Sequence, residues 1–161
     1  MQTTSGTSGL ERRLDVARVA PQAYRAQREL ESYVRGSGLD PTLLELVRLR
    51  ASYMNGCAYC VDMHSKDARA AGETEQRLYS LGAWRETPWF SDAERAALAL
   101  TEAVTLLHDG HVPRPVFEEA AQHFEPEPLA QLISLLVAVN AWNRIGVTTR
   151  CWEPGSYESD G

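Results

Sequence analysis

The 161-residue chain lacks the features of a nucleic-acid-binding or membrane protein. It has 16 lysine and arginine residues against 22 aspartate and glutamate residues, a formal net charge of −6, and no basic run. Because an acidic surface repels phosphates, nucleic acid is not expected as a partner. No stretch approaches the roughly 20 apolar residues of a transmembrane helix, and residues 1–9 contain no apolar core of a signal peptide. We therefore expect a cytoplasmic protein that has no membrane partner.

The sequence also lacks a disulfide framework and a strand pattern. Its three cysteines are an odd number, which does not suit a set of structural disulfides. No alternating run of Val, Ile and Thr predicts a β-strand, whereas apolar residues recur at helical spacing through most of the chain. The sequence therefore predicts an all-α bundle of about six to seven helices in a single domain over 10–152. We expect residues 1–9 to be disordered and 153–161 to form a loose tail.

Local start and stop signals predict where the helices lie. Pro21 can begin the first helix, and Asp40 followed by Pro41 can begin the second. Ser91 and Glu94 have the spacing of a capping box, and a packed loop is expected over 82–90. The expected helices span about 21–35, 41–55, 57–71, 73–81, 91–110, 113–124 and 127–145.

The last of these helices is apolar on nearly every side. A helix of this kind is buried, and in a small chain another subunit can supply part of the burial. We therefore expect a homo-oligomer. Asn140 and Asn143 interrupt the apolar surface, and we expect both to be hydrogen-bonded structural or interface groups.

The chemistry is expected to lie in Cys57, Cys60 and His64. Spacings of three and four residues place these side chains on one helix face, and the two sulfurs can reach disulfide geometry. The positive end of a helix favours a thiolate, which is the nucleophile toward peroxides and disulfides. Cys60 is expected to lie within reach of His64 and deeper in the helix, with Cys57 at the more exposed end. Cys151 has no neighbouring base in the sequence and is interpreted as a bystander thiol.

Two simpler interpretations stay open for these residues. The cysteines could be core thiols, since free cysteine is often buried. They could also bind zinc with His64 and a distant fourth ligand such as Glu45 or His108, although the chain has no second CxxC or HxxxH motif. We expect neither a metal nor a bound cofactor. For Glu45 alone, a surface salt bridge with Arg48 three residues later is the simplest interpretation.

The joint motif resembles the signature of the AhpD-like alkylhydroperoxidase family, within the carboxymuconolactone decarboxylase superfamily. Eleven residues separate Glu45 from Cys57, two separate Cys57 from Cys60, and three separate Cys60 from His64. Segments 46–50, 55–60 and 139–145 are also similar to that family, and the likeness covers roughly residues 21–150. Such a joint motif is far more specific than a lone CxxC.

The resemblance implies an all-helical protein that assembles as trimers or hexamers and reduces hydroperoxides. Cys60 would attack the peroxide, Cys57 would supply a proton and close the disulfide, and His64 with Glu45 would relay protons. A lipoylated or thioredoxin-like dithiol protein would restore the thiols. Helix-end exposure alone instead nominates Cys57 as the more reactive thiol. Well-studied members have a histidine where this chain has Tyr59, whose phenol shuttles protons poorly at neutral pH, so less efficient turnover is expected.

Two other functions are compatible with the sequence. One is a lactone enzyme similar to carboxymuconolactone decarboxylase, against which the cysteine pair argues. The other is a non-catalytic thiol redox sensor that uses the same disulfide as a switch.

Overall fold

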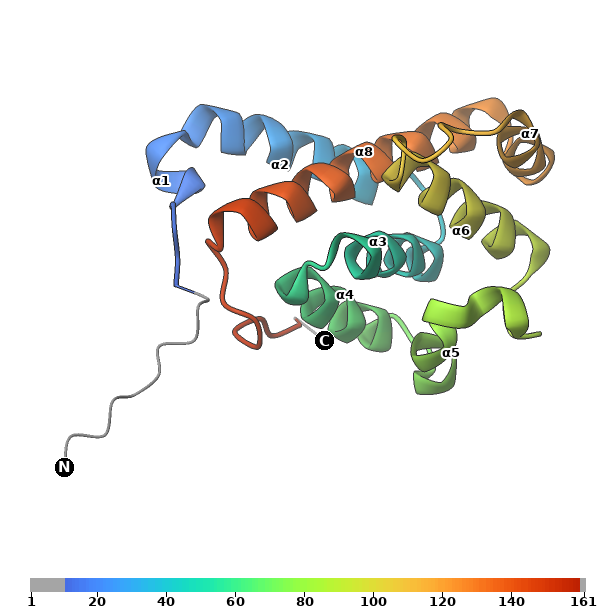
Figure 1. Ribbon diagram of the computed structural model, residues 1–161, viewed down its shortest axis with the longest axis horizontal. Coiled ribbons are helices and arrows are strands. Elements are labelled where there is room, and N and C mark those ends of the chain that lie inside the picture. The colour runs from blue at the N-terminus through green and yellow to red at the C-terminus, as the bar shows by residue number, and fades with distance from the viewer. Residues whose placement is uncertain (1–10, 160–161) are drawn as a thin grey trace.

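Residues 11–159 form a bundle of helices in the computed structural model, and no strand occurs among them (Figure 1). The all-α prediction is confirmed, whereas the expected disorder of residues 1–9 concerns residues outside this range. The elements are α1 (Val16–Val19), α2 (Pro21–Arg35), α3 (Pro41–Asn55), α4 (Ala58–Ala70), α5 (Glu75–Ser80), the 3₁₀ helix η1 (Leu81–Glu86), α6 (Asp92–Thr105), α7 (Arg114–His123) and α8 (Pro126–Thr149).

Helix α3 lies at the centre of the bundle, with α4, α6 and α8 packed against it (Figure 1). Its start is fixed by Asp40, whose carboxylate accepts hydrogen bonds from the backbone N–H groups of Thr42 and Leu43. Its end is fixed by Gly56, which adopts φ 64° in the left-handed region where glycine carries no steric penalty. The turn at Gly56 leads directly into α4, whose N-cap residue is Cys57.

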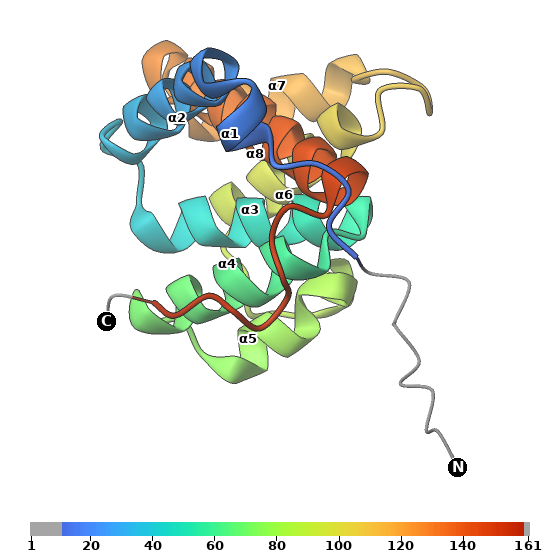
Figure 2. The ribbon, with the colours of Figure 1, turned by 90° about the vertical axis from the view of Figure 1, so that its left-hand side faces the viewer.

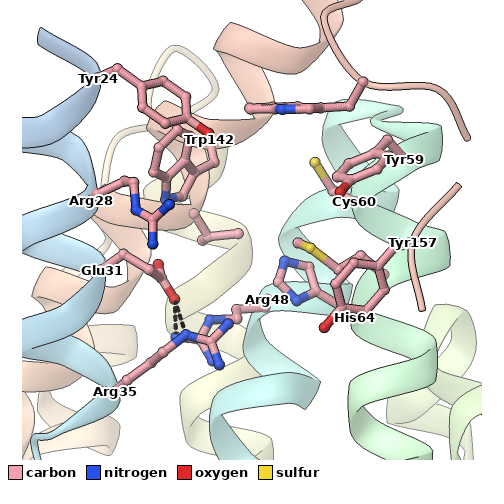
Figure 3. A pocket seen from close by; sticks show the side chains of 13 residues that line it. Tyr24, Arg28, Glu31, Arg35, Arg48, Tyr59, Cys60, His64, Trp142 and Tyr157 are labelled. Carbon is pink, nitrogen blue, oxygen red and sulfur yellow. Dashed lines mark hydrogen bonds and ion pairs between the residues drawn. The ribbon is translucent and has the colours of Figure 1, made fainter. Parts of the chain in front are cut away.

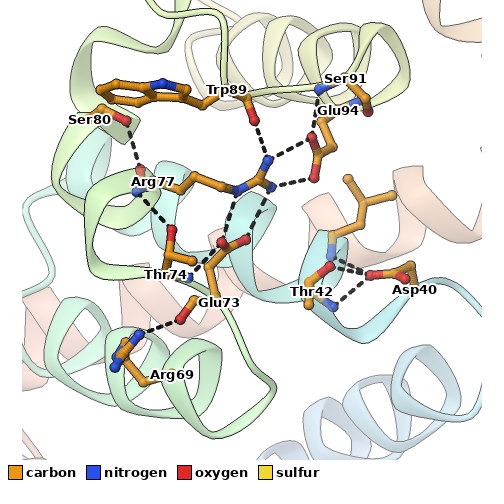
Figure 4. Close-up of polar contacts among 11 residues, drawn as sticks. Asp40, Thr42, Arg69, Glu73, Thr74, Arg77, Ser80, Trp89, Ser91 and Glu94 are labelled. Carbon is orange, nitrogen blue, oxygen red and sulfur yellow. Dashed lines mark hydrogen bonds and ion pairs between the residues drawn. The ribbon is translucent and has the colours of Figure 1, made fainter.

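The predicted capping box at the start of α6 is confirmed, and a neighbouring ion-pair network was not predicted. The Ser91 side chain accepts from the Glu94 N–H, and the Glu94 carboxylate accepts from the Ser91 N–H. Arg77 of α5 reaches both this Glu94 carboxylate and the buried Glu73 (Figure 4). The network ties α5 to the start of α6.

Helix α8 has the length and apolar composition of a membrane-spanning helix, alone among residues 11–159 and contrary to the expectation that no stretch would approach this. Its residues Leu132, Leu135 and Leu136 are fully buried in the main core cluster, against residues of α2, α3 and α6. This is the behaviour of the core helix of a bundle.

The two asparagine side chains of α8 are hydrogen-bonded, as predicted. Asn143 is fully buried, donates to Ser52 Oγ at 3.0 Å and accepts from Asn55 Nδ2 at 2.9 Å. Asn140 donates to Thr105 Oγ1 and accepts from Asn55 Nδ2. The polar cluster therefore links α8 to the end of α3 and to α6.

Several element boundaries differ from the sequence prediction for reasons of packing. The short helix α1 was not predicted, and its cap is Asp15, which accepts from the Arg18 N–H. Part of the expected 82–90 loop is the helix η1, because Leu81 and Trp84 are buried in the second core cluster. Helix α5 begins at Glu75 rather than residue 73, and α6 ends at Thr105 rather than Gly110.

The segment after α8 runs back across α4 (Figure 2). Lys66 Nζ donates to the Tyr157 carbonyl at 2.7 Å, and the Tyr157 hydroxyl donates to Asp67 at 2.7 Å. Ser159 Oγ donates to the same carboxylate at 2.9 Å. The prediction of a loose tail did not anticipate these contacts, which hold residues 157–159 against the helix that carries the cysteine pair.

Candidate redox site

Cys57 and Cys60 form a disulfide at the start of α4, with a Cα–Cα distance of 5.3 Å. Cys57 is the N-cap residue of α4 and Cys60 lies in its first turn. Both residues are only 2% exposed, so the expectation that Cys57 would be the more exposed is wrong. The cause is α8: an ideal Cβ at Gly146 would lie 3.3 Å from Cys57 Sγ and 3.1 Å from the Trp152 ring.

The histidine of the motif is joined to the glutamate of the preceding helix. His64 Nδ1 lies 2.9 Å from Glu45 Oε2, and both side chains are buried. Arg48 donates to Glu45 Oε1 and, through its other terminal nitrogen, to Glu31 Oε1, each at 2.6 Å. The Glu45–Arg48 salt bridge predicted from the sequence therefore exists, but it lies in the interior, where Arg48 is 1% exposed.

Glu45 is held as a carboxylate despite its burial. Burial alone would raise the pKa of Glu45, but the hydrogen bond from His64 and the positive charges of His64 and Arg48 outweigh it and lower this pKa. An ionised Glu45 can only accept, so His64 Nδ1 carries the proton that lies between them. When neutral, His64 then has Nε2 free to accept a proton from another group.

Cys60 and His64 face a common cavity of about 380 Å³, here called the main cavity (Figure 3). Cys57 instead lines a separate cavity of about 170 Å³, between the start of α4 and the end of α8. Tyr59 and Trp152 line both cavities, and their rings stack with centroids 5.4 Å apart. This stacked pair separates the space that reaches Cys60 from the space that reaches Cys57.

Tyr59 fits this separating role better than that of a proton relay. Burial, followed by the influence of Tyr24 and of acidic neighbours, raises the pKa of Tyr59 above its already high usual value. The phenol is therefore neutral near pH 7 and a weak acid. Its stacking on Trp152 gives the side chain a structural reason to occupy the position between the cysteines.

A metal site is not supported by the donors in this region. Glu45, His64 and Asp67 have ligand atoms within 4.8 Å of one another, the single cluster of this type among residues 11–159, and it includes neither cysteine nor His108. The Glu45 oxygens already accept from His64 and Arg48. Asp67 accepts from two hydroxyl groups of the C-terminal segment. A divalent cation at this cluster would also lie beside the Arg48 guanidinium.

Comparison with known proteins places the chain in a family. Residues 21–103 match the model of the carboxymuconolactone decarboxylase family. The chain is 38% identical over 138 residues to the uncharacterized protein YdfG of Bacillus subtilis, covering 86% of this chain and 94% of YdfG. It is 33% identical over 105 residues to the uncharacterized protein YnjA of Escherichia coli, covering 62% of this chain and 54% of YnjA.

Solved structures agree with this placement. A protein of unknown function from Agrobacterium tumefaciens, provisionally assigned as the antioxidant defence protein AhpD, superimposes with a TM-score of 0.86 at 40% identity, over 89% of this chain and 99% of that chain. The debrominase Bmp8, solved as a cysteine-to-alanine variant with 2,3,4-tribromopyrrole, shares the fold with a TM-score of 0.76 at 18% identity, over 85% of this chain and 73% of that chain. The chain belongs to the carboxymuconolactone decarboxylase family. Within it, the chain is an AhpD-like member.

The structure brings together the residues singled out in the sequence and adds others. Glu45 and His64 are in direct contact, and Cys60 shares the main cavity with His64. The sequence reasoning missed Glu31, which comes from α2 and binds Arg48, and the two cavity-lining aromatics of the C-terminal segment, Trp152 and Tyr157. No spacing signal marks these residues, because they approach α4 from other parts of the chain.

Proposed function

We propose that the protein is a thiol-dependent organic hydroperoxide reductase of the alkylhydroperoxidase type. The observation that supports this function best is the Glu45–His64 pair beside a cysteine that lines a ligand-sized cavity. Buried carboxylate–imidazole pairs are suited to moving protons to and from a nucleophile. We place the activity in the cytoplasm, where thiols are kept reduced.

The proposed cycle begins with both cysteines reduced. His64 Nε2 accepts the Cys60 proton, and the thiolate attacks the outer oxygen of the hydroperoxide, so that an S–O bond forms and the O–O bond breaks. The leaving alkoxide takes a proton from the Cys57 thiol or from the His64–Glu45 pair and departs as an alcohol. Cys60 is then a sulfenic acid.

The second half of the cycle restores the enzyme. The Cys57 sulfur attacks the Cys60 sulfur, the disulfide forms, and the hydroxyl group leaves as water. An external dithiol protein, lipoylated or thioredoxin-like, then supplies two electrons and two protons and becomes a disulfide itself. No bound cofactor takes part in this scheme, and we propose that the active form is a homo-oligomer.

Cysteine variants test the assignment. Cys60→Ser is expected to abolish turnover of cumene hydroperoxide with a dithiol reductant. Cys57→Ser is expected to accumulate a sulfenic acid that a dimedone adduct reveals by mass spectrometry. Cys151→Ser is the matched control, because Cys151 is a buried free thiol that does not line the main cavity. Full turnover by Cys60→Ser would contradict the proposal.

A thiol redox sensor is the second candidate, favoured by the burial of both sulfurs and by the presence of Tyr59. A sensor would form the Cys57–Cys60 disulfide once after exposure to peroxide but would show negligible steady-state consumption of peroxide. A single-turnover experiment followed by multiple turnovers on the same sample separates the two functions.

A further inference from the structure

One side of the main cavity is a continuous aromatic wall. The Tyr24 and Trp142 rings meet edge to face with centroids 5.3 Å apart, and Trp142 meets Trp152 in the same way at 5.8 Å. Trp152 then stacks on Tyr59. All of these residues line the cavity, as does Tyr157 (Figure 3). A wall of this type provides both faces and edges for a flat apolar ligand.

The other side of the main cavity carries guanidinium groups. Arg28, Arg35 and Arg48 line it, together with the single carboxylate of Glu31. Glu31 Oε1 accepts from Arg35 at 3.0 Å and from Arg48 at 2.6 Å. The second carboxylate available to these arginines is that of Glu45, which binds Arg48.

The charges on this side do not balance. Three guanidinium groups face two carboxylates, and Arg28 has no hydrogen bond or ion pair with any residue in the described range 11–159. Figure 3 shows its guanidinium pointing into the cavity from α2, between Trp142 and Glu31. Arg28 is an exposed residue, so its guanidinium is open to solvent and available to the carboxylate of a ligand, within a chain whose formal net charge is −6.

We propose that the main cavity binds small aromatic carboxylates, and that the preferred substrates are aromatic hydroperoxides that carry a carboxylate. The ring would lie on the Trp142–Trp152 wall, and the carboxylate would pair with Arg28. The hydroperoxide end would then be directed toward Cys60. The cavity volume of about 380 Å³ suits a ligand of one substituted ring and not a long lipid chain. The statement about hydroperoxides depends on the proposed function, whereas the statement about carboxylate binding does not.

A binding experiment tests the cavity without any turnover. The disulfide form is titrated with para-isopropylbenzoate and with para-isopropylbenzamide, which has nearly the same shape but no charge. Quenching of tryptophan fluorescence and calorimetry report binding, because two tryptophans line the cavity. We expect the benzoate to bind about tenfold more tightly than the amide, and added salt to reduce this difference.

Arg28→Gln is expected to remove the preference for the benzoate, and Arg28→Lys to retain part of it. Arg25→Gln is the matched control, because Arg25, like Arg28, is exposed on α2 and carries the same charge but does not line the main cavity. Equal binding of the two ligands by the unmodified protein would overturn the inference. A benzoate preference that survives in Arg28→Gln, or is lost equally in Arg25→Gln, would do so as well.

A kinetic comparison separates this inference from the proposed function. We expect the unmodified protein to reduce the para-carboxylate of cumene hydroperoxide with about tenfold higher kcat/KM than cumene hydroperoxide itself, and Arg28→Gln to bring the ratio close to one. If benzoate binds through Arg28 but neither peroxide is consumed, the binding site stands and the peroxidase proposal fails. If both peroxides are consumed at equal rates, the peroxidase proposal stands and this inference fails.

Discussion

The replacement of Glu45 by glutamine tests whether the carboxylate–imidazole pair sets the reactivity of Cys60. The side chain keeps its shape and can still accept one hydrogen bond from His64 Nδ1, but it loses its negative charge. In the proposed cycle, His64 becomes an imidazolium when Cys60 ionises. The variant therefore removes the charge that stabilises this imidazolium and also weakens the contact with Arg48, an effect that the Glu31→Gln control reports separately.

The size of the effect follows from the type of hydrogen bond that is lost. A hydrogen bond to a charged group contributes about 1.5–3 kcal/mol and a neutral one about 0.5–1.5 kcal/mol, a difference of about 1–1.5 kcal/mol. This corresponds to about one pKa unit. The imidazolium becomes less stable, so Cys60 ionises at a higher pH. Where the thiol is mostly protonated, we expect the rate constant for its reaction with peroxide to fall about tenfold.

The assay is the reaction of the reduced protein with cumene hydroperoxide under single-turnover conditions, followed from pH 5 to pH 9. Because the pKa of Glu45 is lowered, its carboxylate stays charged through this range, and the two rate profiles should differ by a shift along the pH axis. The profiles should differ most where the Cys60 thiol is protonated and should converge at high pH, where it is ionised in both proteins. Circular dichroism verifies that the variant is folded.

Glu31→Gln is the matched control. Its carboxylate binds the same arginine, Arg48, at the same 2.6 Å distance as Glu45, but it does not contact His64. We expect it to shift the pH profile clearly less than Glu45→Gln does. An unshifted profile in folded Glu45→Gln, or equal shifts in both variants, would refute the role assigned to the Glu45–His64 pair.

Three further predictions concern stability and packing. Burial would raise the pKa of Glu102, but hydrogen bonds from Trp84 and from Arg50 and Arg85 lower it. Glu102→Gln should therefore reduce the free energy of unfolding by about 1–3 kcal/mol at pH 7. This difference in stability should shrink as the pH falls below about 4.5, and urea unfolding at pH 7 and at pH 4 measures it. Asn143→Leu should cost about 1–3 kcal/mol, because the fully buried Ser52 hydroxyl loses its hydrogen bond to Asn143, and thermal unfolding that matches the unmodified protein would contradict this. Gly146→Ala places a methyl group 3.3 Å from Cys57 Sγ and should displace the tryptophan that covers it, so alkylation of Cys57 in the reduced protein, followed by mass spectrometry, should become faster rather than stay unchanged.

The sequence predicted the helices that have strong local signals. Asp40, Gly56 and the Ser91–Glu94 box act through neighbours within a few residues, so their effect can be inferred from the chain alone. The turn of η1 was missed because it depends on the burial of Trp84 against distant helices. The length of α5 was missed because Thr74, and not residue 73, accepts the capping hydrogen bond.

The candidate site was predictable only in part, because some of its residues are brought together by contacts between segments that are distant in the sequence. The spacing of Cys57, Cys60 and His64 predicted a shared helix face, and the family resemblance added Glu45. Relative exposure of the two sulfurs could not be obtained from helix position, because α8 and Trp152 cover Cys57 from elsewhere in the chain. The cationic side of the main cavity depends on how α2 packs on α8 and brings Glu31 to Arg48 of α3, which no short motif encodes.

The anchoring of the segment after α8 has a practical consequence. Trp152 and Tyr157 line the main cavity together with Cys60, so trimming or tagging the chain beyond the last helix would alter the shape of this cavity. Fusion partners for the experiments above therefore belong at the N-terminus. The same segment is a suitable target for engineering. Replacing Trp152 or Tyr157 with a smaller residue would widen the main cavity without changing any helix.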